Sequence, residues 1–350
     1  MNHVQHNARP SAHLGWIDVA KGLTIVLVVI LYANEWVESD ANTRLWLQHV
    51  VDFAAPFRMP AFFLLSGLLL SRSIEHDWRT FLDRKVVHFA YFYLLWLTIL
   101  VFFQAPWIAA EQDGWREVPG LYVRSLVHPY SMLWFIYLLP IFFVVTKLLR
   151  NVPPALVWTL AAALQIADPD TGIKVLDKFI PYYVFFYSGY VLAPRIFALA
   201  RSAAANRTRA VAAFAAWTLV NAYAVSAGIA QAPGAALILG LLGACAVVAG
   251  CTLLTGIRAD LPLAYCGRNS LVIYLGFYIP LVLAGKLVLS SGWVADLGTA
   301  ALLAAAAGVC APLVLHRLVS STRAAFLFER PSWISAAPRR RPQRPAAAAT

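Results

Sequence analysis

Runs of about twenty apolar residues recur along almost the whole chain, and such runs are what an α-helix needs to cross a lipid bilayer. The chain is 61% hydrophobic and 13% charged, with a mean hydropathy of +0.67, whereas a soluble domain has about 25% charged residues. The sequence therefore predicts an all-α fold, a polytopic membrane helix bundle of about ten transmembrane spans. The candidate spans are 14–36, 47–71, 86–106, 131–149, 154–168, 178–197, 208–228, 234–256, 269–288 and 298–318.

The basic residues support this number of spans. If the N-terminus is cytoplasmic and the chain alternates, twenty Lys and Arg fall in cytoplasmic segments and six fall on the opposite side. Lys and Arg accumulate in cytoplasmic loops, so we expect a multi-pass protein of the cell inner (plasma) membrane with both termini cytoplasmic. The same bias explains the net charge of +11 without a nucleic-acid partner.

Three regions follow from this topology. Residues 1–13 are expected to form a cytoplasmic N-terminal tail, and residues 14–318 the transmembrane domain. Residues 319–350, rich in Pro, Ala and Arg towards the end, are expected to form a disordered basic cytoplasmic tail. The tail arginines either contact anionic membrane lipids or only keep the tail soluble.

The four cysteines lie in or beside apolar runs, and none has the spacing of metal ligands. We therefore expect no metal site and no tightly bound cofactor.

The first span carries charged and polar residues at both of its ends. Lys21 and Tyr32 are eleven residues apart, which is close to three helical turns and places both on one face about 16 Å apart. Asp18 precedes Lys21 by one turn, and Glu35 follows Tyr32 by one turn. A charged group inside a bilayer is a candidate functional residue. The alternative is that Lys21 reaches the inner headgroups and Tyr32 belongs to the aromatic belt.

The second span places Arg58 near its middle, between Pro56 and Pro60. Prolines remove helix hydrogen-bond donors, which is tolerated at this depth where protein or water compensates. Arg58 is therefore expected to face a polar interior, with Asp52 as a possible neighbour. It has either a functional role or a purely structural one in an ion pair.

The third span opens with the sequence DRKVVHFAYFYLLW at 83–96. Arg84 and Lys85 at a cytoplasmic mouth suit the phosphates of a nucleotide such as coenzyme A. They suit anchoring to the inner leaflet equally well. His88 lies one turn from Arg84 and is either a base or an ordinary buried histidine.

Together these segments resemble the acyltransferase-3 family of integral membrane acyltransferases. The similar pieces occur in the family order over roughly 14–318: 16–32, 57–67, 83–96, LWFIYLLPIFF at 133–143 and GRNSLVIYLGFYIP at 267–280. The resemblance implies an enzyme that transfers a small acyl group, such as acetyl or succinyl, from acyl-CoA as co-substrate. The implied acceptor is a hydroxyl of a cell-envelope carbohydrate or glycolipid.

The resemblance also implies roles for particular residues. Lys21 matches the family's basic residue in the first span, and the arginine of the third-span motif looks like Arg84; with Lys85 they would bind the donor. Tyr32 stands where the family has a histidine thought to be catalytic. We therefore expect Tyr32, with Glu35 and Asn34, at the reacting groups, and Arg58 to offset negative charge. His88 is a further catalytic candidate, and His128 is a reserve base on the outer loop.

The tyrosine leaves other functions open. Tyrosine is a poor base near neutral pH. The alternative to an enzyme is a non-catalytic transporter or flippase of a lipid-linked sugar, or a degenerate homologue with a structural role.

Overall fold

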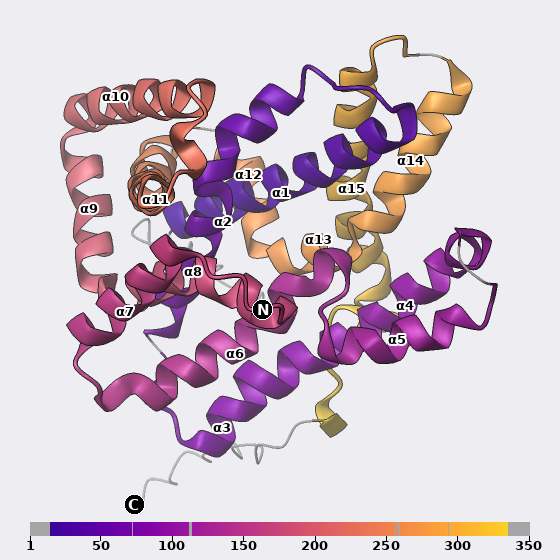
Figure 1. Ribbon diagram of the computed structural model, residues 1–350, viewed down its shortest axis with the longest axis horizontal. Coiled ribbons are helices and arrows are strands. Elements are labelled where there is room, and N and C mark those ends of the chain that lie inside the picture. The colour runs from indigo at the N-terminus through magenta and orange to yellow at the C-terminus, as the bar shows by residue number, and fades with distance from the viewer. Residues whose placement is uncertain are drawn as a thin grey trace, which may run out of the picture.

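The computed structural model describes residues 15–334 except 72, 112–113, 256, 258–259 and 293. The predicted tail 1–13, and residues 335–350 of the other predicted tail, lie outside the described residues. Every regular element in the described part is helical (Figure 1). The α-helices are α1 (Gly15–Ala41), α2 (Gln48–Leu70), α3 (Trp78–Leu82), α4 (His88–Glu111), α5 (Glu117–Val127), α6 (Trp134–Leu148), α7 (Pro154–Ala167), α8 (Lys174–Val191), α9 (Ala193–Ala205), α10 (Arg207–Ser226), α11 (Ala235–Leu254), α12 (Asp260–Arg268), α13 (Ser270–Gly276), α14 (Tyr278–Ser291) and α15 (Leu297–Val319). The short elements are the π-helix η1 (Asp83–Val87) and the 3-10 helices η2 (Ser131–Leu133), η3 (Leu149–Asn151), η4 (Ile229–Gln231), η5 (Arg323–Leu327) and η6 (Ser332–Ile334).

The polytopic helix bundle is confirmed, whereas the number of ten spans is not confirmed. Within the described residues, six helices are long and apolar enough to cross a membrane, or up to eight if two bent pairs each form one span. The bent pairs are α8 with α9, at 75°, and α13 with α14, at 58°. The predicted fifth span, 154–168, forms α7, which has only 14 residues. The predicted seventh, 208–228, corresponds to α10, which begins with Arg-Thr-Arg and is not among the spanning helices.

Glycines allow the central helices to pack with their backbones in contact. Where α2 crosses α8, a Cβ atom on Gly67 would lie 1.9 Å from the carbonyl oxygen of Phe186, and one on Gly189 would lie 2.0 Å from that of Leu64. Small residues drive helix association in membranes because they permit this close approach. The crossing fixes α8 against α2, the helix that carries Arg58.

Helix α1 lies in the interior of the bundle, packed against α2, α12 and α15 (Figure 1). A Cβ atom on Gly267 of α12 would lie 1.7 Å from the carbonyl oxygen of Asp18, so these two helices also touch through their backbones. Asp18 forms a long ion pair with Arg268, at 4.0 Å, and not with Lys21. Lys21 is therefore held among helices rather than facing lipid alone.

Two sets of hydrogen bonds identify the two ends of the bundle. At one end, which we call the Trp46 side, the Trp46 indole donates to Asp296 at 3.0 Å. Asp296 lies before α15 and also accepts from the hydroxyl and amide of Thr299; these bonds, that of the Thr299 hydroxyl foremost, lower the pKa of Asp296. At the opposite end, the Lys147 side, the Lys147 ammonium donates to the carbonyls of Ile74 and His76, both at 2.6 Å.

Lys147 is one of the twenty Lys and Arg assigned to cytoplasmic segments by the topology, but the residue is only 1% exposed. Its ammonium also lies over the rings of Trp78 and Phe81, 5.0 and 4.5 Å from their centroids. Two carbonyls and two aromatic faces replace the water that a buried ammonium loses. Lys147 thus fixes residues 74–76 to the end of α6.

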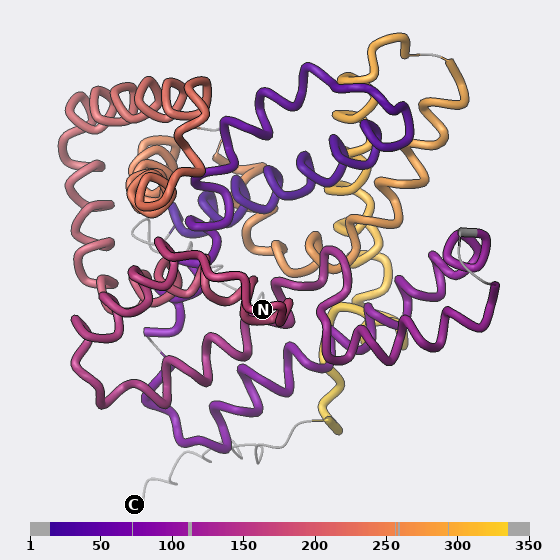
Figure 2. The backbone as a smooth tube through the Cα atoms, viewed as in Figure 1, coloured from indigo at the N-terminus to yellow at the C-terminus, as the bar shows by residue number. Residues whose placement is uncertain are grey.

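The described part of the expected disordered tail packs on the bundle instead. After α15 the chain runs beside α4 (Figure 2), where the carbonyls of Phe326 and Leu327 accept hydrogen bonds from Tyr91 and Trp96. Phe328 is buried, and Arg330 pairs with the buried carboxylate of Asp83 at 2.8 Å. Composition alone missed this, because the Pro-, Ala- and Arg-rich sequence begins only after these aromatic and paired residues.

Candidate functional site

A cavity of about 170 Å³, which we call the lysine cavity, contains two of the predicted donor-binding residues. Lys21 of α1 and Lys85 of η1 both line it. The rest of its wall is largely apolar, with Phe62 and Leu65 of α2 and Phe143 of α6 among the lining residues. The Lys85 ammonium lies 4.8 Å from the centroid of the Phe143 ring. Two ammonium groups in an apolar wall favour an anionic ligand.

Arg84 and Lys85, the two neighbouring basic residues of the third span, both lie in the π-helix η1 but have different surroundings. Arg84 is exposed, whereas Lys85 is half-buried and lines the lysine cavity. A π-helical turn inserted at the start of a longer helix is often found at functional sites. The structure therefore brings Lys21 and Lys85 together and leaves Arg84 outside the cavity wall.

A second cavity of about 220 Å³, the tyrosine cavity, contains Tyr32, Glu35 and Arg58. Tyr32 and Glu35 come from the same face of α1, as their spacing predicts, and Arg58 comes from α2. The Tyr32 ring packs against Phe277, with centroids 5.3 Å apart, at the bend between α13 and α14. Its hydroxyl interacts with the Trp134 side chain. Glu35 and Arg58 are close enough to interact electrostatically.

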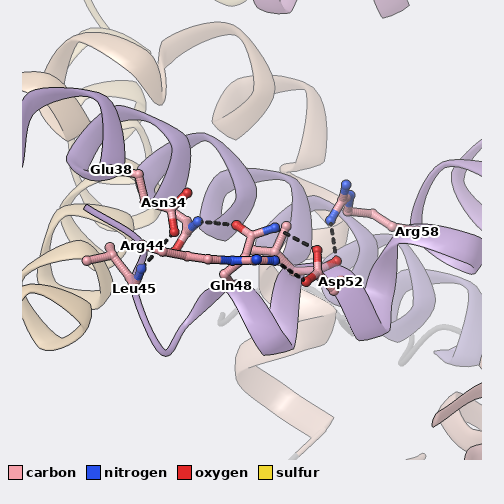
Figure 3. Close-up of polar contacts among 8 residues, drawn as sticks. Asn34, Glu38, Arg44, Leu45, Gln48, Asp52 and Arg58 are labelled. Atoms are coloured by element: carbon pink, nitrogen blue, oxygen red, sulfur yellow. Dashed lines mark hydrogen bonds and ion pairs between the residues drawn. The ribbon is translucent and has the colours of Figure 1, made fainter. Parts of the chain in front are cut away.

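Arg58 is buried, with 7% of its surface exposed. One of its terminal nitrogens lies 3.5 Å from the carbonyl oxygen of Val51, and its Nε atom has no hydrogen-bond partner within the described chain. The predicted neighbour Asp52 accepts instead from Gln48 and Arg44, at 2.6 and 3.3 Å (Figure 3). Asp52 is therefore not the partner of Arg58, and the Nε atom of the guanidinium remains unsatisfied.

The lysine and tyrosine cavities have part of their walls in common. Phe62, Phe135 and Tyr274 line both of them. Lys21 lies near the start of α1 and Tyr32 about 16 Å further along it, so the shared residues separate a basic end from a polar end. An elongated molecule bound with one end at the lysines would reach the tyrosine cavity past two phenylalanines and a tyrosine.

Comparison with known proteins agrees with this architecture. The sequence profile of a family described as an acyltransferase domain, Acyl_transf_3, matches residues 14–317. The chain belongs to this acyltransferase-3 family. It is also similar to the inner membrane protein YcfT of Escherichia coli (strain K12), with 26% identity over a match that covers 48% of this chain and 54% of that protein. The match thus spans about half of the length of that relative. No solved structure matches the chain.

Three other predicted residues of this acyltransferase-3 family member lie apart from the tyrosine cavity. His88 packs against Phe89 and Phe92 and has Arg330, Lys85 and Asp83 as its charged neighbours. His128 ends α5 and is exposed. Asn34 is fully buried on another face of α1, where it donates to Gln48 at 2.6 Å (Figure 3). Asn34 therefore braces α1 against α2, and neither histidine lies beside Tyr32.

Sequence analysis missed several residues of the tyrosine cavity in this family member. Lys178 and Tyr182 of α8, Trp134 of α6 and Tyr274 of α13 all line it. The Lys178 ammonium lies 5.7 Å from the centroid of the Trp134 ring. Lys178 and Tyr182 are four residues apart, so they share a helix face, and that spacing could have identified them. Trp134 and Tyr274 lie inside family-like motifs that mark no individual residue.

Proposed function

We propose that this protein transfers a small acyl group, acetyl or succinyl, from acyl-CoA to a hydroxyl of a cell-envelope carbohydrate or glycolipid. It acts in the inner membrane, where membrane lipids surround the bundle. The donor's phosphates bind at the Lys147 side of the bundle, next to Lys21 and Lys85. Arg84, exposed just outside the lysine cavity, contacts the more distal phosphate groups of the nucleotide.

The main support for this proposal is that two cavities with different charged groups share part of their walls. Lys21 and Lys85 line the first, Tyr32, Glu35 and Arg58 line the second, and Phe62, Phe135 and Tyr274 line both. Acyl-CoA has the matching form, with anionic phosphates at one end and a neutral thioester at the other. The aromatic wall limits access of water to the thioester, which reduces hydrolysis of the activated acyl group.

The tyrosine cavity supplies the groups that acyl transfer requires. The hydroxyl oxygen of the acceptor attacks the thioester carbonyl carbon, and the Glu35 carboxylate takes the hydroxyl proton. Arg58 or Lys178 stabilises the negative charge that develops on the carbonyl oxygen. The C–S bond then breaks, and the CoA thiolate leaves and is protonated. In this scheme Tyr32, held by Trp134 and Phe277, positions the acyl group by hydrogen bonding and is not the base.

Loss of an ester from the cell envelope tests the reaction. Envelope glycans from cells with and without the gene are compared by mass spectrometry, and the purified protein is given acetyl-CoA or succinyl-CoA labelled in the acyl group. We expect an O-linked acyl group to disappear when the gene is deleted and the label to appear in glycan with the purified protein. Unchanged glycan esters combined with movement of a lipid-linked sugar across the membrane would favour the transport alternative.

A further inference from the structure

A third cavity, about 350 Å³ in volume, borders the tyrosine cavity at Arg58. We call it the glutamine cavity because Gln165 and Gln231 line it. Arg58, Met59 and Tyr182 line both this cavity and the tyrosine cavity. Its volume is within the range of about 300–1,000 Å³ found for small-molecule sites. The three cavities therefore form a series, in which each shares part of its wall with the next.

The glutamine cavity opens near the Trp46 side of the bundle, opposite the lysine cavity. Helix α7 starts just after Lys147 and ends at Ala167, and it is the residues at this far end that contribute to the wall. The loop between α10 and α11 contributes residues 230–233. A molecule entering from this side reaches Arg58 and Tyr182 without passing the donor site.

Two polar atoms at this cavity have no partner. Gln165 is 9% exposed and Arg58 is 7% exposed, and both line the cavity. The Oε1 atom of Gln165 and the Nε atom of Arg58 have no hydrogen-bond partner in the described part of the chain. A buried polar atom without a partner costs about 1–3 kcal/mol. The wall residues of this cavity thus carry one unsatisfied acceptor and one unsatisfied donor.

Asp168 adds a carboxylate to the cavity, and its backbone is in a strained conformation. It follows the last residue of α7 and has φ +37°, in the left-handed region where glycine or asparagine is usual. Asp168 is one of the residues that line the cavity. Strained backbone conformations cluster at binding and active sites.

The mixture of groups indicates the class of ligand. A carboxylate, two carboxamides, a guanidinium and the Tyr182 hydroxyl offer both donors and acceptors. Vicinal hydroxyl groups, which donate and accept together, pair with such a set, whereas a phosphate would be repelled by Asp168. No group of three His, Cys, Asp or Glu side chains suited to a metal ion occurs among the described residues.

We propose that the glutamine cavity binds the polyhydroxylated acceptor and presents one of its hydroxyls to Glu35 past Arg58 and Tyr182. Delivery of the hydroxyl to the reacting groups rests on the function proposed above. Binding of the sugar itself does not, so it can be tested without acyl-CoA.

The test uses the full-length protein in lipid nanodiscs and saturation-transfer NMR with methyl glycosides of glucose, galactose, mannose, rhamnose and N-acetylglucosamine. The variants are Gln165→Leu, which removes the free acceptor, and Asp168→Asn, which removes the charge but suits the left-handed backbone. Asp170→Asn is the matched control, because Asp170 is exposed in the same loop and, among the described residues, accepts a hydrogen bond from the amide of Gly172 alone. Elution as a single species in size-exclusion chromatography confirms that each variant is folded.

We expect at least one glycoside to bind the wild type, and binding to weaken roughly tenfold in Gln165→Leu and in Asp168→Asn, as loss of a hydrogen bond to a charged or buried group would cause. Asp170→Asn should bind as the wild type does. Unchanged affinity in both variants, binding of inorganic phosphate instead, or no glycoside binding at all would overturn the assignment. If the glycoside binds as expected but receives no acyl group from labelled acyl-CoA, the acceptor site stands and the proposed reaction fails.

Discussion

The lysine cavity and the tyrosine cavity lie next to each other but differ in the sign and variety of their charges. Among the described residues, the charged groups of the first are the cations Lys21 and Lys85. The second combines the carboxylate of Glu35 with the cations Arg58 and Lys178. A site with cations alone holds an anion, whereas a carboxylate beside cations can also accept a proton while the cations stabilise an oxyanion. In the function proposed here, this difference separates donor binding from chemistry within one bundle.

The largest effect is expected for Glu35→Gln, which removes the carboxylate from the tyrosine cavity. We expect the rate of acyl transfer to fall about 100-fold or more, because a positioned base contributes ~10²–10⁴. The dissociation constant of CoA, measured by isothermal titration calorimetry, should stay within twofold in the variant, or roughly 0.4 kcal/mol. Glu117→Gln on the exposed α5 is the matched control. Equal loss of CoA binding and of transfer would mean that the two cavities do not have separate roles.

The converse change removes a cation from the lysine cavity. Lys21→Ala and Lys85→Ala should each weaken CoA binding roughly tenfold, since a hydrogen bond to a charged group contributes about 1.5–3 kcal/mol. Arg84→Ala, outside the cavity wall, should weaken it less than about fivefold. Lys286→Ala is the control, because its ammonium lies over Trp107, 4.2 Å from the ring centroid, on α14. A larger loss in Arg84→Ala than in Lys85→Ala would contradict the donor position.

Substitution of Tyr32 tests its role beside Glu35. Tyr32→Phe should lower kcat about tenfold, since it removes one hydrogen bond in the tyrosine cavity and leaves the base in place. Measured donor KM should change little. If Tyr32→His shows CoA-dependent transfer and the wild type shows none, then the natural protein is not an acyltransferase and the transport or structural alternatives gain support.

The smallest expected effect comes from the shared wall. Phe135→Leu leaves the site apolar but widens the passage between the two cavities. We expect the ratio of acyl-CoA hydrolysis to acyl transfer to rise about threefold, because water then reaches the thioester more easily. Free CoA release and acyl-glycan formation are measured in the same reaction. Phe102→Leu on the exposed surface of α4 is the control. An equal rise in that variant would mean that the shared wall does not protect the thioester from water.

The sequence predicted the helical membrane bundle, and several of the residues it singled out line the two cavities, each for a clear physical reason. Apolar runs identify spanning helices whatever their packing, and the spacing of Tyr32 and Glu35 places them on one helix face. Arg58 was identified because an arginine between prolines in an apolar span needs a polar surrounding. Apolar runs, helical spacing and neighbouring prolines are local features of the sequence, so they can be interpreted without knowledge of the tertiary structure.

Features that depend on packing were not predictable. The count of ten spans is not confirmed, because a length of apolar sequence does not show that α7 stops after 14 residues or that α8 and α9 meet at 75°. Lys178 is one of the six basic residues that the topology placed opposite the cytoplasm, and the sequence does not show that α8 packs on α2 and brings it to the tyrosine cavity. Asp52 looked like the partner of Arg58 because sequence distance does not show that Gln48 and Arg44 engage it first.

In the proposed function, one donor molecule occupies both cavities. The most direct test is a cryo-EM structure of the full chain in nanodiscs with a non-hydrolysable thioether analogue of acetyl-CoA. We expect phosphate density beside Lys21 and Lys85 and the pantetheine arm of the analogue beside Phe62, Phe135 and Tyr274. The acyl carbon should lie within the tyrosine cavity near Glu35. Phosphates bound elsewhere on the protein, or an acyl end that stays outside the tyrosine cavity, would contradict it.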